Sequence, residues 1–152
     1  MASLWRNTHD PVDAQPLDGK ASGVKPLVLV VEDHDDTRFM LRYLMEVRGC
    51  RVLEAVDGEE AVSLAESAHP DLILMDTTLP RLDGLMATQR IRGIASLHDV
   101  PIVFLSAQAH PDSRAHALET GGNDYLVKPP RLSDLESAVE RHLGKSRAPG
   151  IQ

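Results

Sequence analysis

The sequence has a single cysteine among 152 residues, and aromatic side chains make up only 3% of it. One cysteine cannot form an intrachain disulfide, so a disulfide-stapled scaffold is excluded and the reducing cytoplasm is the expected location. No apolar run reaches the roughly 18 to 20 residues that span a bilayer. The first ten residues also lack the apolar segment of a secretory signal. Membrane contact and secretion are therefore not expected.

Positive charge is also in short supply. The chain has 16 Lys and Arg against 23 Asp and Glu, which gives a net charge of -7. Residues 1–25 carry three charges of each sign and residues 144–152 carry two positive charges, so residues 26–143 carry a net charge of -9. Binding to nucleic acid or to anionic lipid needs basic patches that displace counterions. We therefore expect no direct contact with nucleic acid.

The length suits one compact domain, and composition places its boundaries. Residues 1–25 are rich in Asp, Pro, Gly and Ser without an apolar period, which predicts a flexible N-terminal tail. A helix stop at Gly144 predicts a short C-terminal tail over 144–152 and a single domain over 26–143. Because only nine residues follow Leu143, we expect no attached output domain and an output through another protein.

Short apolar runs of strand length recur along residues 26–143. The runs at 27–31, 72–75 and 102–105 are continuously apolar, as in parallel strands that are covered on both faces. Residues 51–55 alternate polar and apolar side chains, and the run at 125–127 is short. These last two are expected at the edges of the sheet.

Amphipathic stretches alternate with these runs. Two of them begin with capping boxes, in which Asp57 is paired with Glu60 and Ser133 with Glu136. Helices are predicted over 37–48, 59–68, 84–93, 111–120 and 134–143. Five strand–helix units with right-handed crossovers predict an α/β fold with a doubly wound parallel sheet of strand order 2-1-3-4-5. In such a sheet, ligands bind at the carboxyl ends of the strands.

Charged and polar side chains stand at those carboxyl ends. Glu32 and Asp33 end the first strand, Asp76 the third, Ser106 the fourth and Lys128 the fifth. Two carboxylates about 5 Å apart repel each other by about 3 kcal/mol at an effective dielectric constant near 20. A lysine supplies part of the counter-charge, and oxygen ligands favour Mg²⁺, or Mn²⁺, over zinc for the rest.

Four motifs carry a family resemblance. They are Val30-Val31-Glu32-Asp33, Leu72 to Asp76 followed by Leu79 to Gly84, Pro101 to Ala107, and Gly121 to Pro129. In this order, each at its strand end, they resemble the receiver domain of the two-component response-regulator family over about residues 26–143. The resemblance implies a flavodoxin-like receiver fold of the stand-alone, single-domain type, and a signalling module rather than an enzyme.

The resemblance also implies a role for each site residue. Asp76 would accept a phosphoryl group from the phosphohistidine of a sensor histidine kinase or a histidine phosphotransfer protein. Lys128 would pair with Asp76 and then with a phosphoryl oxygen, while Ser106 and Tyr125 would switch inward. Mg²⁺ would be held by Glu32, Asp33, Asp76 and the backbone carbonyl of Thr78, and phosphoryl oxygens by the backbone N–H groups of Thr77 and Ala107.

The implied output is altered binding to a downstream protein, by a monomer or by a dimer that depends on phosphorylation. The Lys128–Pro129 peptide is expected to be cis. The chain departs from the family pattern at Pro130, where a bulky apolar residue is usual, which puts the contacts made there in doubt.

Three other functions are less well supported by the residues. A Mg²⁺-dependent phosphohydrolase that forms an aspartyl phosphate usually has a second Asp two residues after the nucleophile, where this chain has Thr78. An FMN-binding protein of similar fold would need a phosphate beside the four acids within residues 32–36, which would repel it. A receiver that is never phosphorylated is the third alternative, but all the reacting positions are filled.

Overall fold

The computed structural model describes residues 24–144 of the chain, so the tails expected over 1–25 and 144–152 lie almost entirely outside it. Five parallel strands form one sheet in the order β2-β1-β3-β4-β5, which confirms the predicted doubly wound α/β fold. The strands are β1 Leu27–Val31, β2 Arg51–Ala55, β3 Leu72–Asp76, β4 Ile102–Ser106 and β5 Asp124–Val127.

Burial along the strands follows their place in the sheet. Every residue of β3 and β4 is buried, as is all of β1 after its first residue. The edge strands β2 and β5 each bury only one residue fully. Continuous apolar runs therefore identified the interior strands correctly, because a strand covered on both faces has no polar side.

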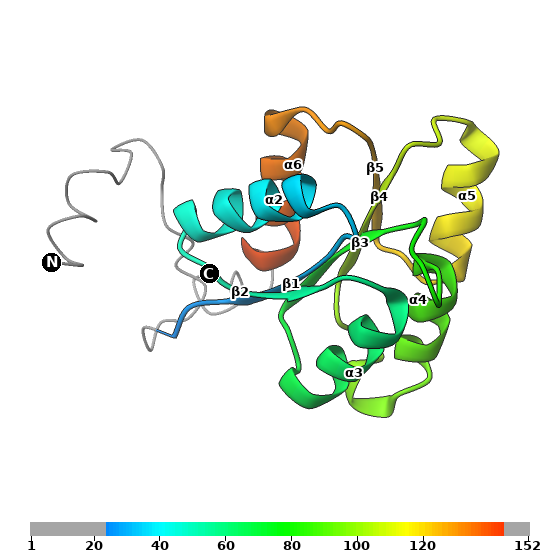
Figure 1. Cartoon of the computed structure of the whole chain (residues 1–152), viewed down its shortest axis with the longest axis horizontal. Helices are drawn as coiled ribbons and strands as arrows, with labels where there is room; N and C mark the ends of the chain where they lie inside the picture. Colours follow the sequence, from blue (N-terminus) through cyan, green and yellow to red (C-terminus); the bar gives the residue numbers. More distant parts are fainter. Residues whose placement is uncertain (1–23, 145–152) are drawn as a thin grey trace, which may run out of the picture.

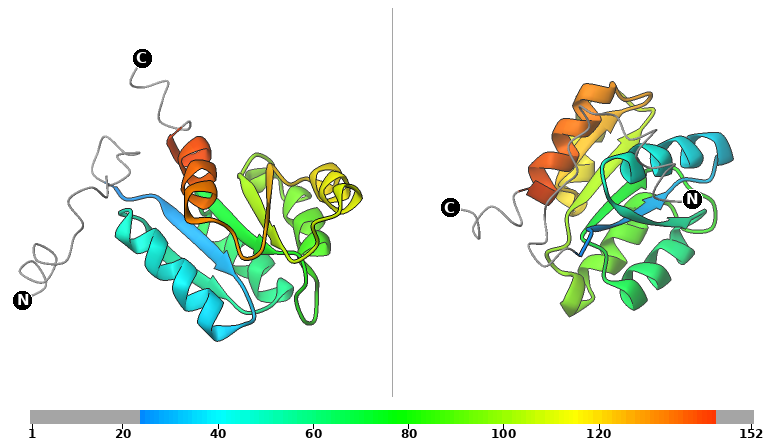
Figure 2. Two further views of the ribbon diagram at one scale, coloured as in Figure 1. Left: turned by 90° about the horizontal axis from the view of Figure 1, so that it is seen from above. Right: turned by 90° about the vertical axis from the view of Figure 1, so that its left-hand side faces the viewer.

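Helices cover both faces of the sheet. They are α2 Asp35–Val47, α3 Gly58–Ala68, α4 Gly84–Arg92, α5 Pro111–Thr120 and α6 Leu132–Val139, with short turns η1 Ala95–Leu97 and η2 Glu140–Gly144. Figures 1 and 2 show α2 and α6 on one face and α3, α4 and α5 on the other. Among the described residues, no helix is long and apolar enough to cross a membrane.

The core is split in two by the sheet, because successive side chains of a strand point to opposite faces. Leu29, Ile73 and Phe104 belong to the half-core that includes alanines of α3, α4 and α5. Val30 and Leu74 belong to the other half, with side chains of α2 and α6. Helices therefore pack against both faces of the sheet, and this packing fixes the relative positions of the strand ends.

Three helices begin earlier than their sequence patterns indicate, α3 by one residue and α2 and α6 by two. Helix α2 begins at Asp35 rather than Thr37, so the two aspartates that follow His34 lie in its first turn, where negative charge is favourable. Helix α6 begins at Leu132, and Leu135 N donates to Arg131 O at 3.0 Å. The capping box predicted at Ser133 is therefore wrong, since Ser133 lies inside the first turn of α6 and Arg131 occupies the cap position.

The capping box at the start of α3 is present in a modified form. Asp57 Oδ1 accepts from Glu60 N at 2.8 Å, as predicted. Glu60 Oε1 accepts from the N–H of Val56, one residue before the cap, at 2.8 Å. Both ends of the box are therefore hydrogen-bonded, and the start of α3 is well fixed.

Arg92, at the end of α4, belongs to the packing of the domain rather than to a solvated helix face. Its guanidinium donates to the backbone oxygen of Gly121 at 2.8 and 3.1 Å, to Leu97 O at 3.1 Å and to Asn123 Oδ1 at 2.9 Å. These partners lie on η1 and on the turn that leads to β5. A helix-period pattern gives no signal for such loop contacts, so the sequence alone does not predict them.

Cys50 provides a test of the packing between α2 and β2. Its thiol is buried, and burial raises the pKa of this thiol to about 11. At pH 8 the thiolate fraction is then about 100-fold below that of a free thiol, so we expect folded protein to resist iodoacetamide. Intact mass after timed alkylation, with and without urea, measures this. Rapid and complete labelling of the folded chain would contradict the structure.

Candidate functional site

The polar strand ends meet at one edge of the sheet. Strands β1, β3, β4 and β5 are consecutive neighbours, and all run in the same direction. Their carboxyl ends therefore bring together side chains that are far apart in sequence. Lys128 lies 96 residues from Glu32 and 52 from Asp76, yet it contacts both.

The ammonium of Lys128 lies between two buried carboxylates. Lys128 Nζ donates to Glu32 Oε1 at 2.8 Å and to Asp76 Oδ2 at 3.1 Å. Burial alone would lower the pKa of Lys128, but these hydrogen bonds outweigh it and hold the pKa above its usual value. Lys128 is therefore charged at neutral pH, and it balances one of the two carboxylates.

The two carboxylates differ in how well they are compensated. Burial acts to raise the pKa of Glu32, yet hydrogen bonds from Lys128 and from the backbone of His34 bring it below its usual value. Burial raises the pKa of Asp76, and the charge on Glu32 adds to this effect. Asp76 is thus the carboxylate of the pair whose negative charge is less well balanced.

Asp33 supplies a further carboxylate, which lacks a hydrogen-bond donor at one of its oxygens. Its Oδ1 is buried without a hydrogen-bond partner, and the nearest cationic group is His34 Nδ1 at 3.5 Å. Ligand atoms of Glu32, Asp33 and His34 lie within 4.8 Å of one another. An orphaned carboxylate oxygen beside the carboxylate of Glu32 fits a hard divalent cation such as Mg²⁺.

His34 is a member of this group that the sequence patterns did not identify. Its Nδ1 lies 3.0 Å from Glu32 Oε2, and the hydrogen bond to Glu32 raises the pKa of His34. Asp76 is not part of the group within 4.8 Å, although it was expected among the metal ligands. In this structure Glu32 and Asp33, here called the acidic pair, lie beside the imidazole of His34, and Glu32 also contacts Lys128.

The backbone beside Asp76 corrects one expectation. Thr77 N–H donates to Leu105 O at 3.1 Å, because the pairing of β3 with β4 continues one residue past Asp76. It therefore does not point at the expected phosphoryl position. Thr78 N–H donates to Asp76 Oδ1 at 3.1 Å instead. Ala107, the other expected backbone donor, follows the buried Ser106 and is exposed.

The two expected switch residues are linked through one backbone segment. Ser106 Oγ accepts from Gln108 N at 3.1 Å, and the Tyr125 hydroxyl donates to Gln108 O at 2.7 Å. Tyr125 is only 5% exposed, so its ring is buried in this structure rather than turned toward solvent. A pocket of about 250 Å³ adjoins both residues, and it is lined by Thr77, Thr78, Asp83, Leu85, Ser106, Gln108, Ser113, His116, Ala117 and Tyr125.

Arg38 is a second residue that the sequence patterns missed. Its guanidinium donates to Glu32 O at 3.0 Å, to Glu54 Oε1 at 2.9 Å and to Asp35 Oδ1 at 2.7 Å. It thereby ties the backbone of the acidic pair to β2 and α2. Glu32, just after β1, and Glu54, on β2, lie 6 and 16 residues away from it, so no spacing rule identifies them. The Lys128–Pro129 peptide is cis, as expected.

Comparisons with known proteins agree with this geometry. The family model described as the response regulator receiver domain matches residues 28–140. The transcriptional regulatory protein PrrA of Mycobacterium tuberculosis is 40% identical over 115 residues, which are 76% of this chain and 48% of PrrA. The chain spans about half the length of most of the curated relatives it matches. Since those relatives are named as transcriptional regulators, the expected lack of nucleic-acid contact stays a prediction.

Two solved structures extend the comparison. The receiver domain of the sensor histidine kinase PA1611 from Pseudomonas aeruginosa, with a magnesium ion in its active-site cleft, is 37% identical with a TM-score of 0.74, covering 80% of this chain and 99% of that one. A second match is the co-crystal structure of the Saccharomyces cerevisiae histidine phosphotransfer protein Ypd1 with the receiver domain of Ssk1. It has 29% identity and a TM-score of 0.76, covering 81% of this chain and 92% of the matched one. The chain belongs to the response regulator receiver domain family of two-component signalling.

Proposed function

We propose that this chain takes a phosphoryl group from a phosphohistidine onto Asp76 and thereby changes its binding to a partner protein. The observation that carries the proposal is the shared contact of Lys128 with Glu32 and Asp76. It puts a fixed cation beside a buried carboxylate whose charge is incompletely balanced. Such a carboxylate, at the carboxyl end of a central strand, is suited to accept an electrophilic phosphorus atom.

The residues of the site would act mainly by positioning and by balancing charge. As an Asp76 oxygen bonds to phosphorus, the P–N bond of the donor breaks, and the electron pair leaves with the imidazole. Lys128 neutralises charge on the phosphoryl oxygens, which is the main demand of this reaction. Glu32 and Asp33 would hold Mg²⁺, which supplies further neutralisation when bound. The orphaned Asp33 Oδ1 supports this assignment.

The response would pass through Ser106 and Tyr125. A phosphoryl group on Asp76 would offer charged acceptors to the Ser106 hydroxyl and to the backbone at Ala107. Each hydrogen bond to a charged group contributes about 1.5 to 3 kcal/mol. One such bond shifts a two-state equilibrium by one to two powers of ten. Because Gln108 contacts both hydroxyls, a movement of Ser106 would be passed directly to Tyr125.

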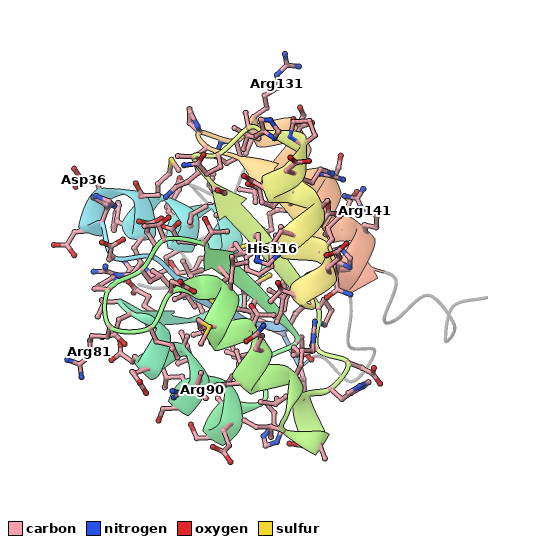
Figure 3. The ribbon with its side chains drawn as sticks, turned by 90° about the vertical axis from the view of Figure 1, so that its right-hand side faces the viewer. Asp36, Arg81, Arg90, His116, Arg131 and Arg141 are labelled. Atoms are coloured by element: carbon pink, nitrogen blue, oxygen red, sulfur yellow. The ribbon has the colours of Figure 1, made fainter. Side chains whose placement is uncertain are left out.

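The phosphodonor would dock on α2. Phe39, Met40 and Tyr43 are 59, 43 and 53% exposed, an unusual concentration of apolar surface on one helix. Phe39 and Tyr43 are four residues apart and so share a face. The helix begins two residues after Asp33, and Figure 3 labels Asp36 in its first turn. A donor protein seated there would bring its phosphohistidine to the carboxyl edge of the sheet.

Serine substitutions on α2 test the docking surface. We expect Phe39→Ser and Tyr43→Ser each to slow transfer by about 10-fold, using the fastest donor from a panel of histidine kinases. Phosphorylation by a small phosphodonor should not change, because it needs no docking surface. Glu66→Ala, an exposed change on α3, is the control. Equal rates for all variants and the wild type would show that the donor binds elsewhere.

The phosphorylation itself is tested by incubating the chain with Mg²⁺ and acetyl phosphate and measuring its intact mass. We expect one added phosphoryl group, which is lost on standing. Steady hydrolysis of phosphate monoesters without an adduct would favour the phosphohydrolase alternative instead. A signalling role in the cytoplasm completes the proposal, and the single, buried thiol of Cys50 supports that location.

A further inference from the structure

The loop between β3 and α4, residues 77–83, brings Thr78 to the acceptor Asp76. Its two ends are joined, because Gly84 N donates to Thr77 O at 2.9 Å. This approach is close: a Cβ atom on Gly84 would lie 2.0 Å from Asp76 O. Any change in the course of the loop would therefore move the backbone that surrounds Asp76.

The far end of the loop adopts a conformation that L-residues rarely take. Arg81 has φ 69, in the left-handed region, and Leu82 N donates to Pro80 O at 2.7 Å across it. A three-residue turn with positive φ at its centre is the rarer, strained form of the γ-turn. Such a conformation persists only where surrounding structure holds it. Figure 3 shows Arg81 at the margin of the molecule.

The first residue of α3 contacts this turn. A Cβ atom on Gly58 would lie 1.8 Å from Leu82 O and 2.6 Å from the Leu82 carbonyl carbon. Gly58 is buried, and its φ is not positive, so its own backbone does not require glycine. The close approach of Leu82 is what requires it. Leu82 is itself only 8% exposed and belongs to the core beside Ala61 and Ala65 of α3.

Asp57 adds a second contact with the same turn. Its Oδ1 caps α3 through Glu60 N at 2.8 Å, while its Oδ2 lies 3.2 Å from Arg81 Nε. The carboxylate is 13% exposed although the Arg81 side chain is 70% exposed. One side chain thus fixes both the start of α3 and the residue with the strained φ.

We propose that Asp57 and Gly58, here called the α3 clasp, are positioning residues for the phosphoryl site. Within residues 24–144, the clasp forms no hydrogen bond or ion pair with Lys128 or with the carboxylates of the site. It holds residues 80–82 against α3, and the closed loop passes this constraint to Thr78. Thr78 N–H then keeps its direction toward Asp76 Oδ1, at 3.1 Å. This inference rests on the proposed function, because it assigns the clasp a role in that reaction.

Gly58→Ala gives different expectations with and without the clasp. The added methyl group would meet Leu82 O, so a merely structural role for Gly58 predicts a less stable variant that binds Mg²⁺ and is phosphorylated as the wild type is. The clasp predicts that the added methyl group displaces Leu82. We then expect Mg²⁺ affinity, measured by calorimetry, and the rate of phosphorylation by acetyl phosphate each to fall by about 10-fold or more. Amide NMR signals of Thr77 and Thr78 should shift.

Asp57→Asn is the second variant, and it decides the question if Gly58→Ala does not fold. Asparagine caps a helix as well as aspartate does, so α3 keeps its cap and only the charge facing Arg81 is lost. We expect smaller changes in the same direction, at least 2-fold in Mg²⁺ affinity, with shifted Thr78 amide signals. Glu59→Ala, an exposed change in the same turn of α3, should leave the Mg²⁺ affinity, the rate of phosphorylation and the Thr78 amide signals unchanged.

Lowered thermal stability with unchanged Mg²⁺ affinity, phosphorylation rate and Thr78 amide signals would overturn the clasp. So would equal effects from Glu59→Ala. A wild-type chain that accepts no phosphoryl group would instead disprove the proposed function. In that case the Mg²⁺ titration and the loop amide signals still decide whether Asp57 and Gly58 position the loop.

Discussion

Asp76→Asn is expected to abolish the phosphoryl adduct. Asn has nearly the shape of Asp, so Lys128 keeps its bond to Glu32 and the packing at the end of β3 is preserved. The amide oxygen is a far weaker nucleophile than a carboxylate, and no other carboxylate of the site has the same contacts with Lys128 and the Thr78 N–H. Intact mass after incubation with acetyl phosphate and Mg²⁺ should show no added phosphoryl group.

The same variant separates loss of chemistry from loss of fold. Two buried carboxylates share one ammonium in the wild type, so removing one charge should leave the chain no less stable without Mg²⁺. At 100 times its Kd, Mg²⁺ stabilises a protein by about 2.7 kcal/mol. At the same Mg²⁺ concentration, we expect Mg²⁺ to stabilise Asp76→Asn less than the wild type. Asp99→Asn, at a carboxylate that is 98% exposed, is the matched control and should keep the adduct. A full adduct on Asp76→Asn would place the acceptor elsewhere.

Lys128→Met is expected to have the second largest effect. Met retains much of the side-chain volume but leaves Glu32 and Asp76 without their shared cation. Breaking a buried ion pair by removing one partner costs about 3 to 5 kcal/mol, so the variant should unfold at a clearly lower temperature without Mg²⁺. The rate of phosphorylation should fall by about 10² to 10³-fold, the usual effect of removing one fixed charge-stabilising group.

Mg²⁺ provides the internal check on Lys128. The metal ion and the ammonium would both neutralise charge at Glu32, so Mg²⁺ should restore part of the lost stability while the rate of phosphorylation stays low. Thermal melts with and without Mg²⁺ measure the first quantity, and the time course of the adduct measures the second. Arg131→Ala, a nearby exposed residue, is the control. A variant that is phosphorylated at the wild-type rate would show that Lys128 has only a structural role.

The order of the strands could be predicted because burial leaves a direct trace in sequence. Residues 72–75 and 102–105 are apolar without interruption, which requires cover on both faces and hence the centre of the sheet. Alternation at 51–55 marked an edge for the same reason. The starts of α2 and α6 were missed because first-turn residues such as Asp35 and Ser133 fit a cap and a helix equally well.

The membership of the site was also readable, since each side chain stands at the carboxyl end of a strand. Lys128, Glu32 and Asp76 come together as the strand order requires. What could not be read was the direction of individual backbone groups. Thr77 and Thr78 are adjacent and identical in type, and only the extent of the pairing between β3 and β4 decides which N–H faces Asp76.

Contacts between distant elements leave no periodic trace. Arg38 and Arg92 each donate to backbone oxygens on other segments. Gly58 is visible in the sequence, but the reason that only glycine fits there is the close approach of Leu82, 24 residues later. Such requirements depend on the folded loop and appear only when the elements are placed together.

The most direct test of the account is to locate the phosphoryl group after transfer. Wild-type chain would be incubated with Mg²⁺ and acetyl phosphate, reduced with sodium borohydride, which converts an aspartyl phosphate to homoserine, and mapped by tandem mass spectrometry. The account predicts homoserine at position 76 alone, and none without the phosphodonor. An adduct at another residue, or no adduct under conditions in which Mg²⁺ binds, would contradict it.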